Sequence, residues 1–252
     1  TEDAQVLMRR TQNYRKLYDP ETGFFRARRS DGEWDRGDEG FTEGANWTYR
    51  FCVMQDPKGM IELMGGPEAF MRELDRNFDE GHYRHDNEPG HHYAYLYNHC
   101  GRLDKTQQRI PGILAANYKN RPDGLSGNDD CGQMSAWYVL SSLGMYEVEP
   151  AGGRYWFGSP LFDRAEIRVP GGVFTITAGN NSAVNKYIQR VWLNGQPYTK
   201  PWIGHADVMK GGELRFEMGA EEKVWYCPDE PEAYADQRPA EEKRLFKSEA
   251  VE

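Results

Sequence analysis

The sequence predicts an α+β protein in which helices come first and β-strands follow. Apolar residues recur at helical spacing from Thr1 to about Tyr146, whereas after about residue 150 apolar and polar residues alternate. The dipeptide Asn194-Gly195 separates two alternating segments, and both residues tolerate the positive φ angles of a tight hairpin turn. With 38% hydrophobic residues among 252, the chain can bury a core without disulfides or a metal scaffold.

About six helices are expected before residue 150. One face of the first carries Val6, Leu7, Tyr14 and Leu17. Thr42 can cap the second, whose apolar residues are Trp47, Phe51 and Met54.

The dipeptide Gly66-Pro67 predicts the start of a third helix, because a proline in the first turn lacks an N–H group that would be unpaired there anyway. Its buried face is expected to contain Phe70, Met71, Leu74 and Phe78. Further helices are expected over residues 91–100, 107–117 and 133–143, the last ending at Gly144. Pro111 is expected to kink or restart the helix that contains it.

Antiparallel strands are expected over residues 155–158, 165–169, 173–178, 187–193, 214–217 and 223–226. The hairpin turn at Asn194-Gly195 follows the fourth of them. Residues 228–252 contain eight acidic and four basic residues, and we expect them to form a polar C-terminal tail.

Composition excludes several classes of protein. A formal net charge of −9 argues against a nucleic-acid partner, because such proteins need clustered Lys and Arg. No run of eighteen apolar residues is present, so we expect no membrane span, and the first ten residues lack the pattern of a secretion signal. The four cysteines are widely spaced and form no CxxC pair, which argues against a thiolate zinc site.

Three segments place acidic or amide groups beside glycine or proline at a helix start: residues 41–51, 83–98 and 124–138. Free backbone N–H groups at such positions favour a functional site. In the first segment, Glu43 precedes a helix and Trp47 follows one turn later. The alternative is that Glu43 only complements the positive end of the helix dipole.

In the second segment, Asp86, Asn87 and Glu88 precede Pro89, and two histidines, His91 and His92, follow. Clustered oxygen donors in a loop favour calcium, which takes six to eight oxygen ligands. A zinc site is the second alternative, although no HExxH motif is present. A solvated polar loop is the third.

The third segment contains Asn128, Asp129 and Asp130 before a helix, where an aspartate pair can also serve as a cap. The chain has no GxSxG, phosphate-loop or dinucleotide-binding motif. Separated carboxylates without a strong nucleophile favour glycoside hydrolysis, in which one carboxylic acid protonates the leaving oxygen and the other activates water. Glu43 and Asp130 are the predicted pair.

Together, FTEGANW, DNEPGHHYAYLYN and GNDDCGQMSAWYVLSSLGMY resemble, in the same order, the general-acid, calcium and general-base segments of glycoside hydrolase family 92, the calcium-dependent exo-α-mannosidases. The similarity runs from about Gly23 to Tyr226. The resemblance implies removal of terminal α-mannose from glycans with inversion of configuration.

It also implies roles for individual residues of this sequence: Glu43 is the acid, Asp130 is the base, and calcium lies at Asn87 and Glu88. Substrate binding is expected from Trp47, His91, His92, Asn128 and Asp129. Many members have Asp-Glu-Asp where this chain has Asn128-Asp129-Asp130.

The resemblance implies that residues 1–150 form the second half of an (α/α)6 barrel and that residues 151–227 are antiparallel strands of a β-sandwich. An N-terminal polypeptide is then expected to complete both parts, and without it Trp47, Phe51 and Trp137 are expected to be partly exposed. The alternative function is a noncatalytic, calcium-dependent carbohydrate-binding protein. A secreted or periplasmic location is suggested by the resemblance alone.

Overall fold

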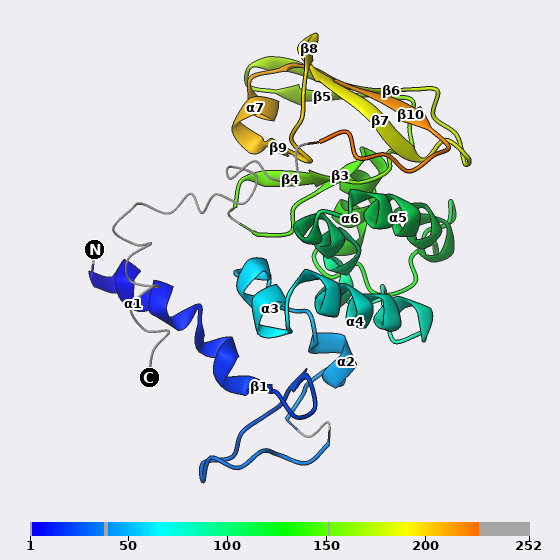
Figure 1. Cartoon of the computed structure of the whole chain (residues 1–252). Helices are drawn as coiled ribbons and strands as arrows, with labels where there is room; N and C mark the ends of the chain where they lie inside the picture. Colours follow the sequence, from blue (N-terminus) through cyan, green and yellow to red (C-terminus); the bar gives the residue numbers. More distant parts are fainter. Residues whose placement is uncertain (1, 38–39, 151, 227–252) are drawn as a thin grey trace.

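The computed structural model describes residues 2–37, 40–150 and 152–226. Most of its helices lie at one end of the molecule and its two larger sheets at the other (Figure 1), so the predicted α+β class is confirmed. The expected tail at 228–252 lies outside the described residues. No helix within these ranges has the length and apolar character needed to cross a membrane.

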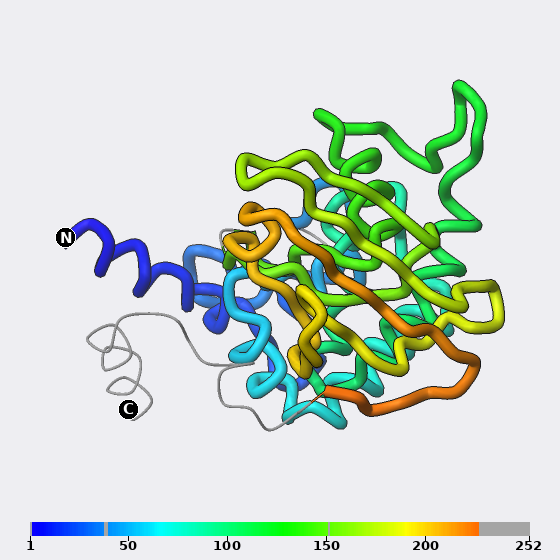
Figure 2. The backbone as a smooth tube through the Cα atoms, turned by 90° about the horizontal axis from the view of Figure 1, so that it is seen from above, coloured from blue at the N-terminus to red at the C-terminus, as the bar shows by residue number. Residues whose placement is uncertain are grey.

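The N-terminal helix α1 (Glu2–Arg10) extends away from the rest of the molecule in two perpendicular views (Figures 1 and 2). None of its residues is buried, and Leu7 is 60% exposed. The 3-10 helix η1 (Asn13–Leu17) follows, and then strands β1 (Tyr18–Asp19) and β2 (Phe24–Phe25) pair with each other. Of the expected apolar face, Val6, Leu7 and Leu17 are exposed, whereas Tyr14, which lies in η1, packs against Phe25.

The second helix differs from the expected one. Helix α2 (Asn46–Tyr49) has a single turn and begins after Ala45 rather than Thr42. Helix α3 (Pro57–Leu63) was not predicted; its local signal is Asp56-Pro57, because the Asp56 carboxylate accepts a hydrogen bond from the N–H of Gly59 (2.9 Å) and caps it.

Helix α4 (Pro67–Asp79) confirms the expected third helix and buries Phe70 and Leu74. It is followed by the 3-10 segments η2 (Glu88–Gly90) and η3 (Tyr93–Cys100). Helix α5 (Leu103–Asn117) continues through Pro111 without restarting, because buried residues on both sides of the proline pack on the same core. Helix α6 (Gln133–Ser142) ends as expected before Gly144, whose φ is +82°.

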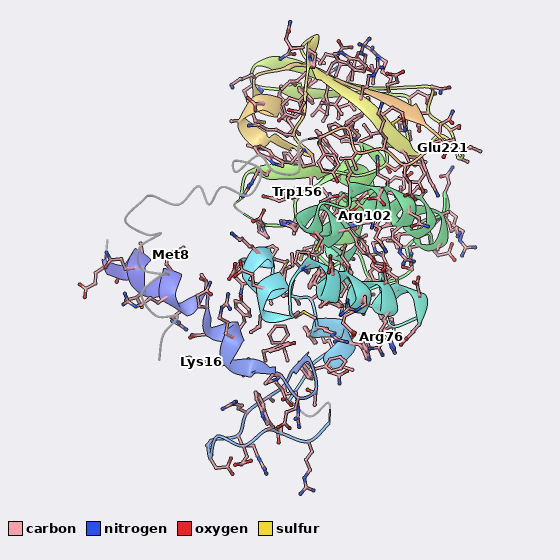
Figure 3. All side chains as sticks on the ribbon, viewed as in Figure 1. Met8, Lys16, Arg76, Arg102, Trp156 and Glu221 are labelled. Atoms are coloured by element: carbon pink, nitrogen blue, oxygen red, sulfur yellow. The ribbon has the colours of Figure 1, made fainter. Side chains whose placement is uncertain are left out.

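A small antiparallel sheet contains β3 (Met145–Tyr146), β4 (Arg154–Phe157) and β9 (Trp202–Gly204). Successive residues of β4 point to opposite faces of this small sheet, one toward the helices and one toward the larger sheet. Trp156 packs with the helices, at the junction visible in Figure 3, whereas Phe157 packs with the larger sheet. This small sheet therefore joins the two parts of the molecule.

The larger sheet has the order β5 (Arg164–Val169), β6 (Gly172–Gly179), β10 (Gly212–Gly219), β7 (Tyr187–Leu193), β8 (Gln196–Pro197). The chain reaches β10 through helix α7 (His205–Met209). The expectation of purely antiparallel pairing is wrong, since β10 is parallel to β6 and antiparallel to β7. The reason is geometric: β6 and β7 run in opposite directions, so a strand inserted between them must be parallel to one of them.

The turn between β7 and β8 confirms the predicted hairpin, with φ of 51° at Asn194 and 77° at Gly195. Residues 223–226, however, form no strand. Tyr226 instead anchors this segment through its side chain, donating a hydrogen bond to the carbonyl of Gly101 (2.5 Å). Side-chain packing therefore replaces the backbone pairing that alternation suggested.

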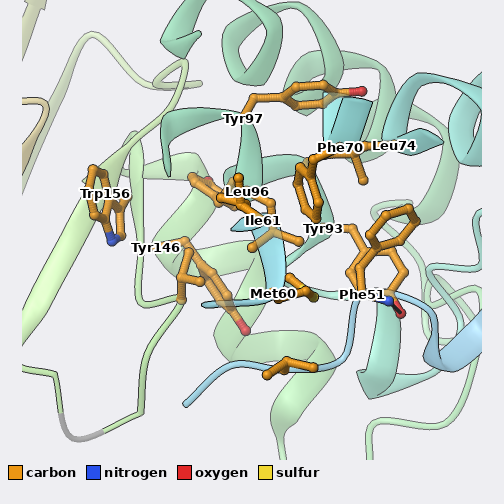
Figure 4. Close-up of a cluster of buried hydrophobic side chains, with 14 of the residues drawn as sticks. Phe51, Met60, Ile61, Phe70, Leu74, Tyr93, Leu96, Tyr97, Tyr146 and Trp156 are labelled. Carbon is orange, nitrogen blue, oxygen red and sulfur yellow. Dashed lines mark hydrogen bonds between the residues drawn. The ribbon is translucent and has the colours of Figure 1, made fainter. Parts of the chain in front are cut away.

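Two hydrophobic cores fill the molecule. The helical core contains Phe51 and Trp137, both fully buried, so their expected exposure is wrong (Figure 4 shows this core around Phe51). The second core lies under the larger sheet, where Phe174, Leu214 and Phe216 are buried against the small sheet and α5. The chain thus covers the apolar face of this sheet with its own residues.

Candidate active site

A cavity of about 1280 Å³ brings parts of the three sequence segments together. Seven of the predicted site residues line it: Glu43, Asn87, Glu88, His91, His92, Asn128 and Asp130. They come from the loop before α2, from the segment around η2 and from the loop before α6. Residues separated by more than 80 positions in sequence therefore meet in one cavity.

The structure does not bring Trp47 and Asp129 to this cavity. The ring of Trp47 stacks on His82, with ring centroids 4.0 Å apart, and its edge meets Phe24. The Asp129 carboxylate accepts a hydrogen bond from the backbone N–H of Ser135 (2.9 Å). Asp129 therefore acts as a cap for the start of α6, which is one of the alternatives the sequence left open.

The predicted acid and base both occupy strained backbone positions. Their φ angles are 63° at Glu43 and 45° at Asp130, in the left-handed region that non-glycine residues seldom adopt. Such positions cost about 1–3 kcal/mol and concentrate at functional sites. Both side chains are exposed to the cavity.

The Tyr49 side chain and a close backbone approach at Gly127 hold these loops. The Tyr49 hydroxyl donates to the carbonyl of Thr42 (2.5 Å), next to Glu43, and the Tyr49 ring stacks on Phe41. A Cβ atom at Gly127 would lie 2.2 Å from the carbonyl oxygen of Asp86. Only glycine therefore lets the loop before α6 approach the segment that carries Asn87 and Glu88 so closely.

Five carboxylates are among the described residues that line the cavity: Glu43, Asp86, Glu88, Asp130 and Glu147. Arg84 is the one Arg or Lys among the described lining residues. It forms a two-point ion pair with Asp86, which lowers the pKa of that carboxyl below its usual value. Asp86 is thus already neutralised by a protein partner.

Asn87 and Glu88 offer hard oxygen donors. The Asn87 side-chain oxygen accepts a hydrogen bond from the N–H of Glu88 (3.0 Å) and caps η2. Within residues 2–37, 40–150 and 152–226, the Glu88 carboxylate has no ion pair or hydrogen bond, and no group of three or more His, Cys, Asp or Glu is arranged to hold a metal. The donor chemistry fits calcium if backbone, water or sugar oxygens complete the ligand set.

Both histidines that line the cavity are buried and tied to protein groups. His91 donates from Nε2 to the carbonyl of His85 (3.1 Å) and accepts at Nδ1 from Gln133 (3.2 Å). His92 donates from Nε2 to the carbonyl of Phe51 (2.8 Å), and burial lowers its pKa to about 4. Burial also lowers the pKa of His91. This arrangement argues against the zinc alternative, because three of the four ring nitrogens are already bonded.

The predicted site residues do not include three other residues that line the cavity: Arg84, Gln133 and Glu147. Gln133 could have been found from its place in the first turn of α6, three residues after Asp130. Glu147 follows a two-residue strand, and no nearby motif marks it. Tertiary structure alone places it in the cavity.

Comparisons with known proteins identify relatives of this chain. The model of the glycosyl hydrolase family 92 catalytic domain matches residues 1–220. The family GH92 α-mannosidase BT3965 of Bacteroides thetaiotaomicron is 39% identical, with a TM-score of 0.77 over 84% of this chain and 30% of that one. The family GH92 inverting mannosidase BT2199 of the same organism is 33% identical, with a TM-score of 0.80 over 89% of this chain and 35% of that one.

A curated relative, an uncharacterized secreted glycosidase of Arthroderma benhamiae, is 32% identical over 187 residues, which are 73% of this chain and 24% of the relative. The chain thus spans between 24% and 35% of the length of these three relatives. The match to the catalytic-domain model nevertheless covers most of this chain, from residue 1 to residue 220. The chain therefore belongs to glycosyl hydrolase family 92.

Proposed function

We propose that this chain carries the acid, base and calcium-binding residues of an exo-α-mannosidase that removes terminal α-linked mannose from glycans with inversion. The observation that carries the proposal is that Glu43 and Asp130 line the same cavity as Asn87 and Glu88. One relative described as an α-mannosidase supports the substrate, and another described as an inverting mannosidase supports the stereochemistry.

In this mechanism the Glu43 carboxyl group gives its proton to the glycosidic oxygen as the bond from C1 to that oxygen breaks. The Asp130 carboxylate takes a proton from water while the water oxygen bonds to C1 from the opposite face. The product is β-mannose, and the two carboxyl groups are expected to be about 6.5–9.5 Å apart to admit the water.

The Asn87 side-chain oxygen and the Glu88 carboxylate would hold calcium. When bound, the ion supplies positive charge for the 2- and 3-hydroxyl groups of mannose and favours distortion of the ring. The support in this chain is that Glu88 is half-buried, lines the cavity and lacks an ion-pair partner among the described residues.

For the whole enzyme, residues 1–150 would form the second half of an (α/α)6 barrel, and residues 151–227 would belong to a β-sandwich completed by an N-terminal polypeptide. The chain covers only 30% and 35% of the length of the two solved relatives, which supports this arrangement. Because the described residues already bury both cores, the N-terminal polypeptide would add to the barrel and the sandwich mainly around the substrate cavity. Action outside the cytoplasm is part of the proposal, supported by the relative described as secreted.

Calcium titration and turnover together test the proposal. Ca²⁺ should raise the melting temperature of the protein and chelation should reverse the rise, whereas Glu88→Ala should weaken both this response and α-mannoside hydrolysis. Glu68→Gln, on the exposed side of α4, is the control that should change neither. Binding of mannosides without hydrolysis, even with the N-terminal polypeptide added, would favour the noncatalytic alternative. A melting temperature that does not change when Ca²⁺ is added would refute the calcium site.

A further inference from the structure

The adjacent histidines His91 and His92 bind different segments of the cavity wall. His92 contacts Phe51, two residues after the end of α2, in the segment 41–51 that carries Glu43. His91 contacts α6, which begins three residues after Asp130. The segment with Asn87 and Glu88 therefore lies between the other two and is bonded to both.

On the side of Glu43, buried hydrogen bonds link His92 and Tyr93 to Thr48 and Phe51. The Nε2–H group of His92 donates to the carbonyl of Phe51 (2.8 Å). The hydroxyl of Tyr93 donates to the carbonyl of Thr48 and accepts from the N–H of Phe51 (3.3 Å). His92 and Tyr93 are each 2% exposed, so water does not compete for these bonds.

On the Asp130 side, Gln133 donates to Nδ1 of His91 (3.2 Å) and to the hydroxyl of Tyr146 (3.0 Å). The indole N–H of Trp137 donates to the carbonyl of His91 (2.8 Å). These bonds fix the first turn of α6 and therefore the loop that carries Asp130. They share no residue with the bonds on the Glu43 side.

We propose that His92, with Tyr93, is a positioning residue for the proton donor Glu43, whereas His91, with Gln133, positions the base Asp130. This inference rests on the proposed function and gives the two histidines a role in addition to the expected substrate contact. In this second role each ring acts through the segment that it binds.

The two roles differ in their dependence on the leaving group. A displaced proton donor slows substrates whose leaving group needs protonation, such as an alkyl or sugar alcohol, but hardly affects a dinitrophenolate, which leaves without a proton. A displaced base slows both kinds of substrate, because water must be activated in each case. A merely structural defect would also slow both, so the leaving-group ratio isolates the Glu43 side.

The experiment compares His92→Leu, His92→Gln and Tyr93→Phe with Gln133→Leu, in the preparation that hydrolyses α-mannosides, either this chain alone or this chain with the N-terminal polypeptide. With methyl α-mannoside, His92→Leu and Tyr93→Phe should lower kcat by about 10- to 100-fold, the effect expected of a misplacement near 1 Å. With dinitrophenyl α-mannoside, kcat should change by less than about threefold. His92→Gln should recover most activity, because its amide N–H can replace Nε2–H. Gln133→Leu should lower kcat on both substrates by similar factors.

Hydrogen exchange supplies a readout that does not need activity. His92→Leu or Tyr93→Phe should speed exchange at the amides of residues 44–51 and leave residues 131–137 unchanged, and Gln133→Leu should do the reverse. If the parent protein hydrolyses no α-mannoside, the proposed function fails while the exchange pattern still tests the positioning. Equal losses on both substrates, or exchange that rises in both segments in every variant, would overturn the inference.

Discussion

The indole N–H of Trp137 donates a 2.8 Å hydrogen bond to the backbone carbonyl of His91, and both residues are almost completely buried. Trp137 also stacks parallel to Tyr118, with 5.8 Å between ring centroids. One side chain of α6 thus holds the segment that carries Asn87 and Glu88 and fills the core behind the cavity.

Trp137→Phe should lower the free energy of unfolding by about 2–3 kcal/mol, because it leaves a small cavity and a buried carbonyl without its donor. Urea unfolding followed by circular dichroism measures the change. Val139→Ala, on the same helix but 54% exposed, is the matched control and should change stability by less than about 0.5 kcal/mol. Equal effects of the two substitutions would contradict this role of Trp137.

Gly127→Ala should lower α-mannoside turnover by about tenfold or more, because the new Cβ must push the Asp130 loop away from the carbonyl of Asp86. Steady-state kinetics checks this. Gly112→Ala in α5 is the control, since no atom lies within 4 Å of its added Cβ, and it should stabilise the helix by about 0.5–1 kcal/mol without loss of turnover. Normal kinetics in Gly127→Ala would show that the close approach is not required.

Stability should fall as the pH drops below 6.5. Burial lowers the pKa of His85 to about 3, that of His92 to about 4 and that of His99 to about 3, from 6.5 in the unfolded chain. Between these values the unfolded chain binds protons that the folded chain does not, so acid favours unfolding. Each histidine contributes a slope of at most about 1.4 kcal/mol per pH unit within its window.

His99→Phe tests this slope away from the cavity. The ring of His99 packs on Trp156, and its Nε2 is buried without a hydrogen-bond partner, so phenylalanine can replace it without breaking a bond at that atom. Urea unfolding at pH 7, 6, 5 and 4 should give a shallower pH dependence for this variant. An unchanged slope would mean that His99 does not contribute.

Glu43→Gln should lower turnover of methyl α-mannoside by about 10²–10⁴-fold, because glutamine keeps the shape but carries no acidic proton. The loss on dinitrophenyl α-mannoside should be much smaller. Comparing the two substrates in one kinetic series checks the role. Unchanged turnover of the methyl glycoside would show that Glu43 is not the acid.

The elements that sequence predicts well are those determined by local chemistry. Gly66-Pro67 and Gly144 mark helix ends through proline and glycine backbone preferences, and Asn194-Gly195 specifies its turn without tertiary help. The parallel pairing of β10 with β6 has no local signal, because it depends on where a distant strand inserts.

The site residues also divide into those that local sequence marks and those that only tertiary structure places. Glu43, Asn87, Glu88 and Asp130 are marked by polar motifs beside helix starts, and the cavity brings them together. The spacing of Trp47 also predicts a substrate contact, but the structure packs its ring against His82 and Phe24, outside the cavity. The bonds made by His91 and His92 depend on segments about 40 residues away, which no local pattern reveals.

The stereochemistry of the first product tests the central claim most directly. Proton NMR of the active preparation with a terminal α-mannoside should show β-mannose appearing first and the α anomer only later by mutarotation, since Asp130 activates water rather than forming a bond to the sugar. Asp130→Asn should abolish the signal of both anomers. An α anomer that appears first, or full activity in Asp130→Asn, would contradict the assignment of Glu43 and Asp130 as an inverting pair.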